Sequence, residues 1–418
     1  MYETTEPHAQ ATRYDDIWLV AGVRTPFADY TSVLSAVSAT DLGIHVARAL
    51  FRRSGVAPSD VGAVVAGNVA QTSCDAFYLP RHVALYSGVP LAVPALAVHR
   101  LCGTGFETIL TAADQIALGR TKLVLCVGSE SMSRNPVVAY GHRNGFKMGQ
   151  VEFKDFLWEA TLDTASGTRM GETAENLARA YGISREQADR FAARSFERAV
   201  QAWDGGFYDD EVEPVTSQSF ILEGYQSRSI KLPREVQSFA RDEHVRASRF
   251  EVLQKLRPAF AADGVQTGGN SSAIVDGAAA ALVASGEYVR AHGLKPLARV
   301  VAGAVVGVPP EVMGIGPAPA IRALLRKAGL NQDAVARFEI NEAFAAQYLA
   351  VEQELALDRE RTNVNGGSIA IGHPLAASGL RLTVTAAREL GRARGEFAIS
   401  SACAGGGQGI AILLQHAA

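Results

Sequence analysis

The chain alternates short apolar runs with longer amphipathic stretches. The run IWLVAGV at 17–23 is uninterrupted and is followed by the turn-forming pair Thr25-Pro26, which predicts a buried strand. From Asp41, apolar residues recur at helical spacing up to Gly55, where a glycine C-cap would end the helix. The alternation continues with a strand at 61–69, a helix at 103–118 and a strand at 122–128. Strands and helices in this order indicate βαβ units and an α/β fold with a covered sheet.

Two stretches of the chain are repeated at nearly the same offset. Residues 54–69 resemble residues 328–343, and in both the end of a helix turns through a polar loop into a strand. The helix that starts near Cys102, with its following strand, likewise matches the helix that starts near His373 and the strand at 396–405. Two matches in one register favour a duplication. We therefore expect two similar α/β halves that pack together, with a site built between them from equivalent loops.

The middle of the chain has no counterpart in the second half. Residues 131–262 are richer in charged and aromatic side chains than the flanking sequence. Within them, 184–202 is predicted to be an amphipathic helix, and Ser184 and Gln187 fit a capping box at its start. We interpret this section as an insertion over the mouth of the site; a purely structural subdomain fits the periodicity equally well.

Composition narrows the class of protein. The 418 residues are 48% hydrophobic and 20% charged, as in globular proteins with more than one core. A net charge of −3 disfavours a nucleic-acid partner, and no run of eighteen apolar residues predicts a membrane span. The first fourteen residues lack an apolar core, so we expect a disordered leader and no signal peptide. Four cysteines are too few for a disulfide scaffold, which favours reduced thiols and a cytoplasmic location.

Two residues at equivalent helix starts are candidates for nucleophilic chemistry. Cys102 precedes a predicted helix, whose free N–H groups would lower the pKa of its thiol; the alternative is a buried cysteine that acts as a small hydrophobe. His373 lies in Gly-His-Pro, which would fix the backbone around the imidazole. If the two halves face each other, these side chains converge into the arrangement of an activated nucleophile.

Two further segments could bind a reacting group. Cys403 is predicted to follow a strand and to open the loop AGGGQG, whose backbone N–H groups could bind an oxyanion. The loop matches neither GxGxxG nor a Lys-containing phosphate loop in the required context. Asn341 is predicted to end a strand, where its amide could hold a water or a carbonyl oxygen. No cysteine or histidine has CxxC or HxxxH spacing, so no metal site is expected.

Nine segments together resemble the motifs of the thiolase family, from about residue 16 to the end of the chain. They are AGVRTPF, HRLCGTG, GSESMS, RMGETAEN, LRPAF, GGNSSAIVDGAAA, NEAFA, GHPLAASG and CAGGGQG. The resemblance implies an α/β fold with a duplicated five-layered α/β/α/β/α core and an inserted loop domain. Residues 15–130 and 263–287 would form the N-terminal half, 131–262 the inserted domain that binds coenzyme A, and 288–418 the C-terminal half. A homodimer or homotetramer is also implied.

The resemblance further implies catalytic roles. Cys102 would be the acylated nucleophile, and His373 would deprotonate it and donate to the thioester oxygen. Cys403 would be the acid/base at C2 of acetyl-CoA. Asn341 would hold a water that forms one oxyanion hole with His373, while the backbone N–H groups of Cys102 and Gly405 would form the second.

The implied substrates are acetyl-CoA and 3-ketoacyl-CoA, with no separate cofactor. The candidate contacts of coenzyme A are Met170, Arg246, Phe260 and Ser272, and Phe344 would form a wall of the acyl pocket. HRLCGTG and RMGETAEN resemble most the acetyl-CoA acetyltransferase type, with a degradative 3-ketoacyl-CoA thiolase as the alternative. Arg169 replaces the histidine of many acetoacetyl-CoA-type members, which bears on chain-length preference.

Two more distant interpretations are disfavoured. A decarboxylating ketoacyl synthase would carry histidine or asparagine in place of Cys403. A non-catalytic CoA-binding subunit would have lost Cys102, which is present.

Overall fold

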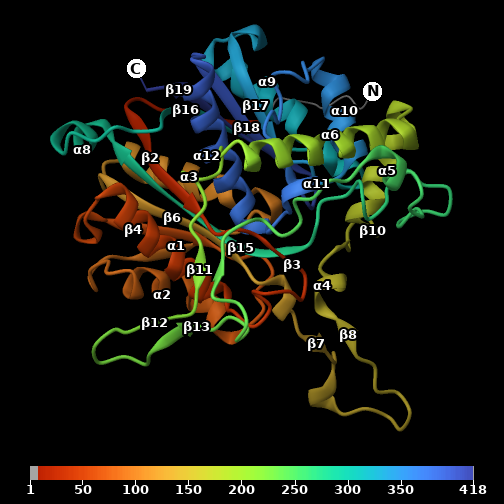
Figure 1. Ribbon diagram of the computed structural model, residues 1–418, viewed down its shortest axis with the longest axis horizontal. Helices are drawn as coiled ribbons and strands as arrows, with labels where there is room; N and C mark the ends of the chain where they lie inside the picture. Colours follow the sequence, from red (N-terminus) through yellow and green to blue (C-terminus); the bar gives the residue numbers. More distant parts are fainter. Residues whose placement is uncertain (1–7, 418) are drawn as a thin grey trace.

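The computed structural model describes residues 8–417, and a large mixed β-sheet runs through it (Figure 1). The strand order is β17 (Val335–Ile340), β18 (Phe397–Ala404), β19 (Gln408–His416), β16 (Ala298–Gly307), β2 (Ile17–Arg24), β15 (Val275–Ser285), β6 (Leu123–Glu130), β4 (Ala63–Gly67) and β5 (Ala95–Ala97). Two half-sheets, one from each half of the chain, join where β2 pairs with β16. Pairing is parallel between β17 and β18 and along β6–β4–β5, and antiparallel elsewhere on this path.

Helices form three layers around the two half-sheets. α3 (Thr104–Ala117) and α12 (Leu375–Ala393) contact each other, and α12 packs on strands of both half-sheets. α1 (Ala39–Ser54) and α2 (Leu79–Tyr86) cover the outer face of one half-sheet. α9 (Pro317–Ala328) covers the other, with α10 (Ala345–Leu355) packed on α9. The predicted duplicated α/β/α/β/α core is confirmed.

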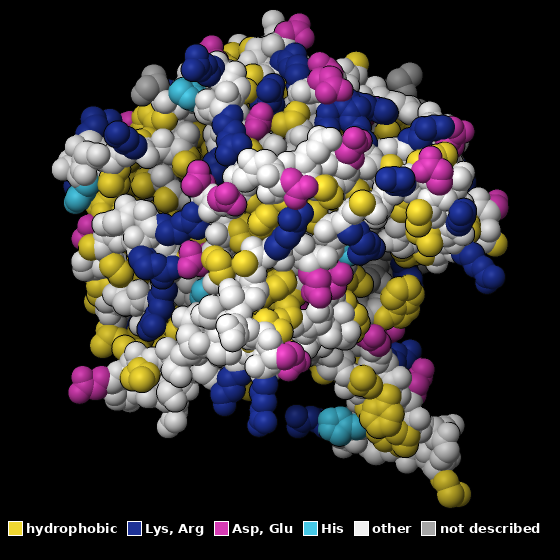
Figure 2. Space-filling model, viewed as in Figure 1, with side chains coloured by type: hydrophobic (Ala, Val, Ile, Leu, Met, Phe, Trp, Pro, Cys, Tyr) yellow, Lys and Arg dark blue, Asp and Glu magenta, His cyan; other side chains and the backbone are white. Residues whose placement is uncertain are grey.

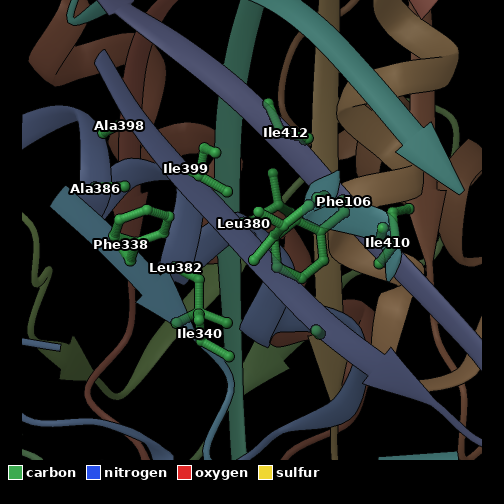
Figure 3. Close-up of a cluster of buried hydrophobic side chains, with 14 of the residues drawn as sticks. Phe106, Phe338, Ile340, Leu380, Leu382, Ala386, Ala398, Ile399, Ile410 and Ile412 are labelled. Atoms are coloured by element: carbon green, nitrogen blue, oxygen red, sulfur yellow. The ribbon is translucent and has the colours of Figure 1, made fainter. Parts of the chain in front are cut away.

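The two central helices approach closely because glycines face each other across them. A Cβ on Gly105 of α3 would lie 2.6 Å from the backbone nitrogen of Leu380 on α12, and one on Gly379 would lie 2.3 Å from that of Phe106. Phe106 and Leu380 then fill the space beside Ile410 of β19 (Figure 3). This packing brings the N-terminal ends of α3 and α12 together, and with them the segments that carry Cys102 and His373.

Local signals in the sequence match the observed helix ends. α1 starts after Ser38, whose side chain accepts a hydrogen bond from the backbone of Asp41, and it ends at Gly55 in the left-handed conformation. α6 (Arg185–Asp204) begins with the predicted capping box of Ser184 and Gln187. The predicted disordered leader is wrong for β1 (Gln10–Arg13), which pairs with β16 and so gains backbone hydrogen bonds; residues 1–7 lie outside the described residues.

The middle section consists of short elements around two longer helices. Its strands are β7 (Val137–Val138), β8 (Lys154–Asp155), β9 (Leu162–Asp163), β10 (Thr168–Arg169), β11 (Val215–Thr216), β12 (Gln218–Phe220), β13 (Arg228–Ile230) and β14 (Ser238–Phe239). Its α-helices are α4 (Phe156–Glu159), α5 (Met170–Tyr181), α6 and α7 (Phe250–Leu253). The arm that carries β7 and β8 extends away from the body, and its apolar and basic side chains are exposed in Figure 2. The exact domain boundaries at 131 and 263 stay a prediction.

Short elements complete the chain. They are β3 (Ala28–Asp29), α8 (Gly286–Ala291), α11 (Ser368–Ile371) and the 3₁₀ helices η2 (Pro58–Asp60), η3 (Cys74–Tyr78), η4 (Leu101–Gly103), η5 (Met132–Arg134), η6 (His142–Asn144), η7 (Pro310–Ile315) and η8 (Gln332–Ala334). Within residues 8–417, no helix combines the length and apolar character that crossing a membrane requires.

Candidate active site

A largely apolar cavity of about 300 Å³ lies where residues 155–171 of the middle section meet loops from both halves. Its lining includes Cys102, Met170, Phe260, Ser272, Phe344 and His373. These residues come from six separate segments of the chain. The fold thus brings the predicted nucleophile, the predicted base and four of the predicted substrate contacts to one cavity.

Cys102 lies in the turn η4, just before α3. Leu101 has a φ of 47°, a left-handed conformation that is strained for a branched side chain and that turns the backbone at the cavity. The backbone N–H groups of Gly405 and of Cys102 itself both act to lower the pKa of the Cys102 thiol, so they lie close to its sulfur. Two donors from different halves of the chain are therefore near the predicted nucleophile.

The predicted lowering of the Cys102 pKa is wrong for the protein without substrate. Burial raises the pKa of the thiol to about 11, although the two backbone N–H groups act in the opposite direction. The helix contributes little because Gly103 is its N-cap, so Cys102 precedes the free N–H groups of the first turn. Cys102 is therefore a neutral thiol at neutral pH, and the predicted nucleophile would need a base to remove its proton.

His373 is held rigidly at the start of α12. Gly372 has a φ of 103°, and a Cβ there would lie 2.5 Å from a methyl carbon of Val275, so this position requires glycine. The backbone N–H of His373 donates to the carbonyl of Ala273 at 3.0 Å. Burial, followed by the positive charge of Arg381, lowers the pKa of His373 to about 3. The imidazole is therefore neutral and can accept a proton.

Asn341 lies directly after β17, as predicted, and is fully buried. Its Nδ2 is 3.4 Å from Nε2 of His373, and its Oδ1 accepts a hydrogen bond from Oγ of Ser368 at 2.7 Å. Because Oδ1 already has a donor, the amide is oriented with its N–H groups toward the imidazole. The carboxamide and the ring are thus arranged as a pair.

Cys403 is buried against the wall of the cavity. It packs with Met313, Ala343, Met170 and Phe344, four residues that also line the cavity. Burial, and then the negative charge that Cys102 carries when ionised, raise the pKa of the Cys403 thiol well above its usual range, so the two sulfurs are electrostatic neighbours. The prediction that Cys403 follows its strand is wrong by a short distance, since β18 ends at Ala404 and the glycine loop comes after it.

Arg246 is the predicted substrate contact that the structure does not bring to the cavity wall. Its guanidinium lies over the ring of Phe196 at 5.8 Å and approaches His244 Nδ1 at 3.2 Å. In contrast, Phe260 and Phe344 form an edge-to-face pair inside the cavity, with centroids 5.7 Å apart.

Residues that support this site were missed in the sequence. Ser378 contacts His373, Ser368 contacts Asn341, and Glu130 accepts hydrogen bonds from the backbone of Val69, Ala70 and Ala376. Ser378 could have been found, because it lies little more than one turn after His373 on the same predicted helix. Ser368 and Glu130 carry no such local signal.

Metal binding requires several donor side chains that face one another. Across residues 8–417, no group of three or more His, Cys, Asp or Glu side chains could hold a metal ion.

Comparison with protein families matches both halves of the chain. Residues 17–287 match the thiolase N-terminal domain, and residues 294–416 match the thiolase C-terminal domain. The chain belongs to the thiolase family.

Individual thiolases resemble this chain over almost its whole length. The human mitochondrial 3-ketoacyl-CoA thiolase is 44% identical over 96% of this chain and 98% of its own. The acetyl-CoA acetyltransferase of Pseudomonas aeruginosa is 40% identical over 96% of this chain and 99% of its own. The crystal structure of the human mitochondrial enzyme in complex with CoA has a TM-score of 0.90 and 44% identity, covering 97% of this thiolase and 98% of that chain.

Proposed function

We propose that this thiolase catalyses the reversible cleavage of 3-ketoacyl-CoA by coenzyme A through an acyl-enzyme on Cys102. The observation that carries the proposal is the convergence of Cys102 and His373 in one cavity, with the backbone N–H of Gly405 on the sulfur. A cysteine beside a neutral imidazole has the arrangement that covalent acyl transfer requires. Similarity to 3-ketoacyl-CoA thiolases and acetyl-CoA acetyltransferases supports the same chemistry.

In the cleavage direction, Nε2 of His373 takes the Cys102 proton while the sulfur attacks the C3 carbonyl. The C2–C3 bond then breaks, the acyl group stays on Cys102, and Cys403 gives a proton to C2 of the departing acetyl-CoA. The thiol of coenzyme A then gives its proton to the Cys403 thiolate and attacks the acyl-enzyme. The C–S bond to Cys102 breaks, Cys102 takes back its proton from His373, and the shortened acyl-CoA is released. In the condensation direction, Cys403 removes the C2 proton of acetyl-CoA, and the carbanion attacks the acetyl group on Cys102.

Two sets of donors can stabilise the negative charge that develops on oxygen. A water held by the amide of Asn341 forms one together with the ring of His373. The backbone N–H groups of Cys102 and Gly405 form the other, and they already converge at the sulfur. Donors fixed in this way need no reorganisation during the reaction, and each contributes about 10²–10³-fold in rate.

We also propose that the acyl site accepts chains longer than acetoacetyl, which favours the 3-ketoacyl-CoA thiolase alternative. Large apolar side chains line the cavity beyond Cys102, among them Leu157, Trp158 and Ile274. The higher identity to a 3-ketoacyl-CoA thiolase supports this range. Rates of thiolysis across a series from four to sixteen carbons would test it, and activity confined to acetoacetyl-CoA would restore the acetyl-CoA acetyltransferase assignment.

The test of the chemistry is intact-mass measurement after incubation with acetyl-CoA. We expect wild type to gain one acetyl group, Cys102→Ala to gain none, and Cys403→Ala to gain one while losing exchange of the C2 protons of acetyl-CoA. Acetylation of Cys102→Ala, or normal exchange in Cys403→Ala, would contradict the assigned roles.

A homodimer or homotetramer is part of the proposal. The edge strand β5 pairs on one side with β4, and Leu96 on it is exposed, as are the nearby apolar residues Phe77, Tyr78 and Leu91. An apolar sheet edge of this kind favours association. Light scattering during gel filtration measures the mass of wild type and of Leu96→Lys; a monomeric wild type would refute the proposal.

The cytoplasmic location and the absence of a nucleic-acid partner stay predictions.

A further inference from the structure

Arg381 is a fully buried arginine on α12, two helical turns after His373. Its Nη2 donates to Oγ of Ser368 at 3.0 Å. The Ser368 hydroxyl in turn donates to Oδ1 of Asn341 at 2.7 Å, and Nδ2 of Asn341 faces Nε2 of His373 at 3.4 Å. A continuous chain of polar contacts therefore connects a buried positive charge to the pair that faces the cavity.

The guanidinium of Arg381 has few hydrogen-bond partners for a buried arginine. Its Nη1 is 3.7 Å from Oε2 of Glu339, which is too long for a good hydrogen bond, and neither its Nε nor its Nη1 has a hydrogen-bond partner among the described residues. Oε2 of Glu339 is likewise without a hydrogen-bond partner there. Burying a charge with so few partners is unfavourable for stability.

A second buried arginine shows how the same fold satisfies such a charge. Arg24 makes two hydrogen bonds to Asp242, at 2.7 and 2.9 Å, and one to Glu211 at 2.6 Å. Its Nη1 also donates to the carbonyl of Thr25. Each guanidinium nitrogen of Arg24 has a hydrogen-bond partner, and Arg24 does not line the cavity. In Arg381 only Nη2 has one, and this partner is Ser368, which in turn contacts Asn341. This contrast indicates that the position of Arg381 serves the site more than the stability of the fold.

We propose that Arg381 is a positioning residue that acts through Ser368 to orient and polarise the amide of Asn341. The guanidinium draws electron density from the Ser368 oxygen, which makes its O–H a stronger donor to Oδ1 of Asn341. Polarisation along such a chain strengthens each successive donor, so the Nδ2 protons of Asn341 become more positive. In the low dielectric of the interior, the positive charge also favours the transition state in which the substrate oxygen becomes negative.

This inference rests on the proposed function, because it assigns Arg381 to the oxyanion-binding side of the thiolase reaction. The effect should appear in the chemical step and not in the binding of coenzyme A, because Arg381 does not line the cavity that holds the candidate contacts Met170, Phe260 and Ser272. We expect Arg381→Met to lower kcat for acetoacetyl-CoA thiolysis by about 10- to 100-fold, the usual range for a group that supports a catalytic residue, with KM nearly unchanged. Arg381→Lys, which keeps the charge, should recover a large part of kcat.

The matched control is Arg337→Met. Arg337 on β17 also joins β17 to α12, through Glu389 at 3.0 Å, but it has no contact with Asn341 or Ser368. We expect this variant to lower thermal stability without changing kcat of the folded enzyme. A loss of kcat in Arg337→Met equal to that in Arg381→Met would overturn the inference, since any break between β17 and α12 would then suffice.

Ser368→Ala provides an independent arm that removes one oxygen and keeps the arginine. If the charge acts through Ser368, the double variant Arg381→Met/Ser368→Ala should lose little more kcat than the worse single variant. Multiplied losses, or an unchanged kcat in Ser368→Ala, would refute the relay even if Arg381→Met fails to fold. Acetylation of wild-type Cys102 is measured first, so failure of the proposed function shows there, while failure of the inference leaves acetylation intact.

Discussion

Nδ1 of His373 lies 2.5 Å from Oγ of Ser378, which is five residues further along α12. The Ser378 hydroxyl donates to the carbonyl of Pro374 at 3.1 Å, so it accepts a hydrogen bond from Nδ1–H. Nε2 is consequently the unprotonated nitrogen that faces Asn341. One serine thus fixes both the orientation and the tautomer of the proposed base.

Ser378→Ala should therefore lower kcat/KM about 10- to 100-fold by releasing the ring into other tautomers and orientations. Nitrogen-15 chemical shifts of the imidazole would show the change of tautomer directly. Thr383→Val is the control, because Thr383 makes the same type of hydrogen bond to the backbone of Gly379 on α12 without touching His373. An unchanged tautomer with full activity in Ser378→Ala would contradict this role.

The raised pKa of Cys102 predicts how fast the free enzyme is alkylated. A thiol with a pKa near 11 holds very little thiolate at pH 7, and the thiolate fraction grows tenfold per pH unit below the pKa. Alkylation of Cys102 by iodoacetamide should therefore rise steadily from pH 7 to beyond pH 9. Cys102→Ala supplies the background from the other thiols, followed by peptide mass mapping. A rate that is already at its plateau at pH 7 would show that the sequence-based expectation of a low pKa was right.

The close approach of α3 and α12 predicts a large loss of stability in Gly105→Ala. The new Cβ would meet three backbone atoms of α12 within 2.8 Å, and backbone cannot move aside as a side chain can. We expect the free energy of unfolding to fall by about 3 kcal/mol or more. The control is Gly391→Ala on α12, whose new Cβ would have only the His416 ring nearby, at 3.9 Å, and this variant should be neutral or stabilised by about 0.5–1 kcal/mol. Denaturant unfolding of both variants measures the difference, and equal stabilities would contradict the packing argument.

The contact between Arg169 and Trp158 predicts that Arg169 affects the preference for the length of the acyl chain. Its guanidinium lies 4.4 Å from the centre of the Trp158 ring and donates to the Trp158 carbonyl, which holds the segment that lines the acyl site. In Arg169→Ala we expect kcat/KM for an eight-carbon 3-ketoacyl-CoA to fall about tenfold, and that for acetoacetyl-CoA to fall about twofold or less. The longer chain loses more because each buried CH₂ contributes about 0.8 kcal/mol.

The control for Arg169→Ala is Arg190→Ala. Arg190 stacks on Phe250 at 4.3 Å, a similar contact in the same section of the chain but away from the cavity. Equal losses for the two chain lengths in Arg169→Ala, or the same pattern in Arg190→Ala, would show that the segment does not select the acyl chain.

The sequence by itself determined the α/β class and the two similar halves of the fold, and it predicted the principal reacting groups. Helix ends such as Ser184 and Gly55 depend on hydrogen bonds within a few residues, so local patterns reveal them. The internal repeat carried longer-range information, because equivalent helix starts in two packed halves have to meet. That relation predicted that Cys102 and His373 lie in one site, and both line the same cavity.

Only the tertiary structure decided the protonation states of these groups and the hydrogen bonds that hold them in place. The pKa of Cys102 depends on how much water the surrounding segments exclude, and this opposed the helix effect that the sequence suggested. Arg246 lies over Phe196 and not at the cavity because the packing of α6 sets its direction. The hydrogen bond from Arg381 to Ser368 joins α12, which packs on β17, to the separate helix α11. The burial and the direction of a side chain depend on many contacts with residues that are distant in the sequence. No local pattern of residues therefore predicts them.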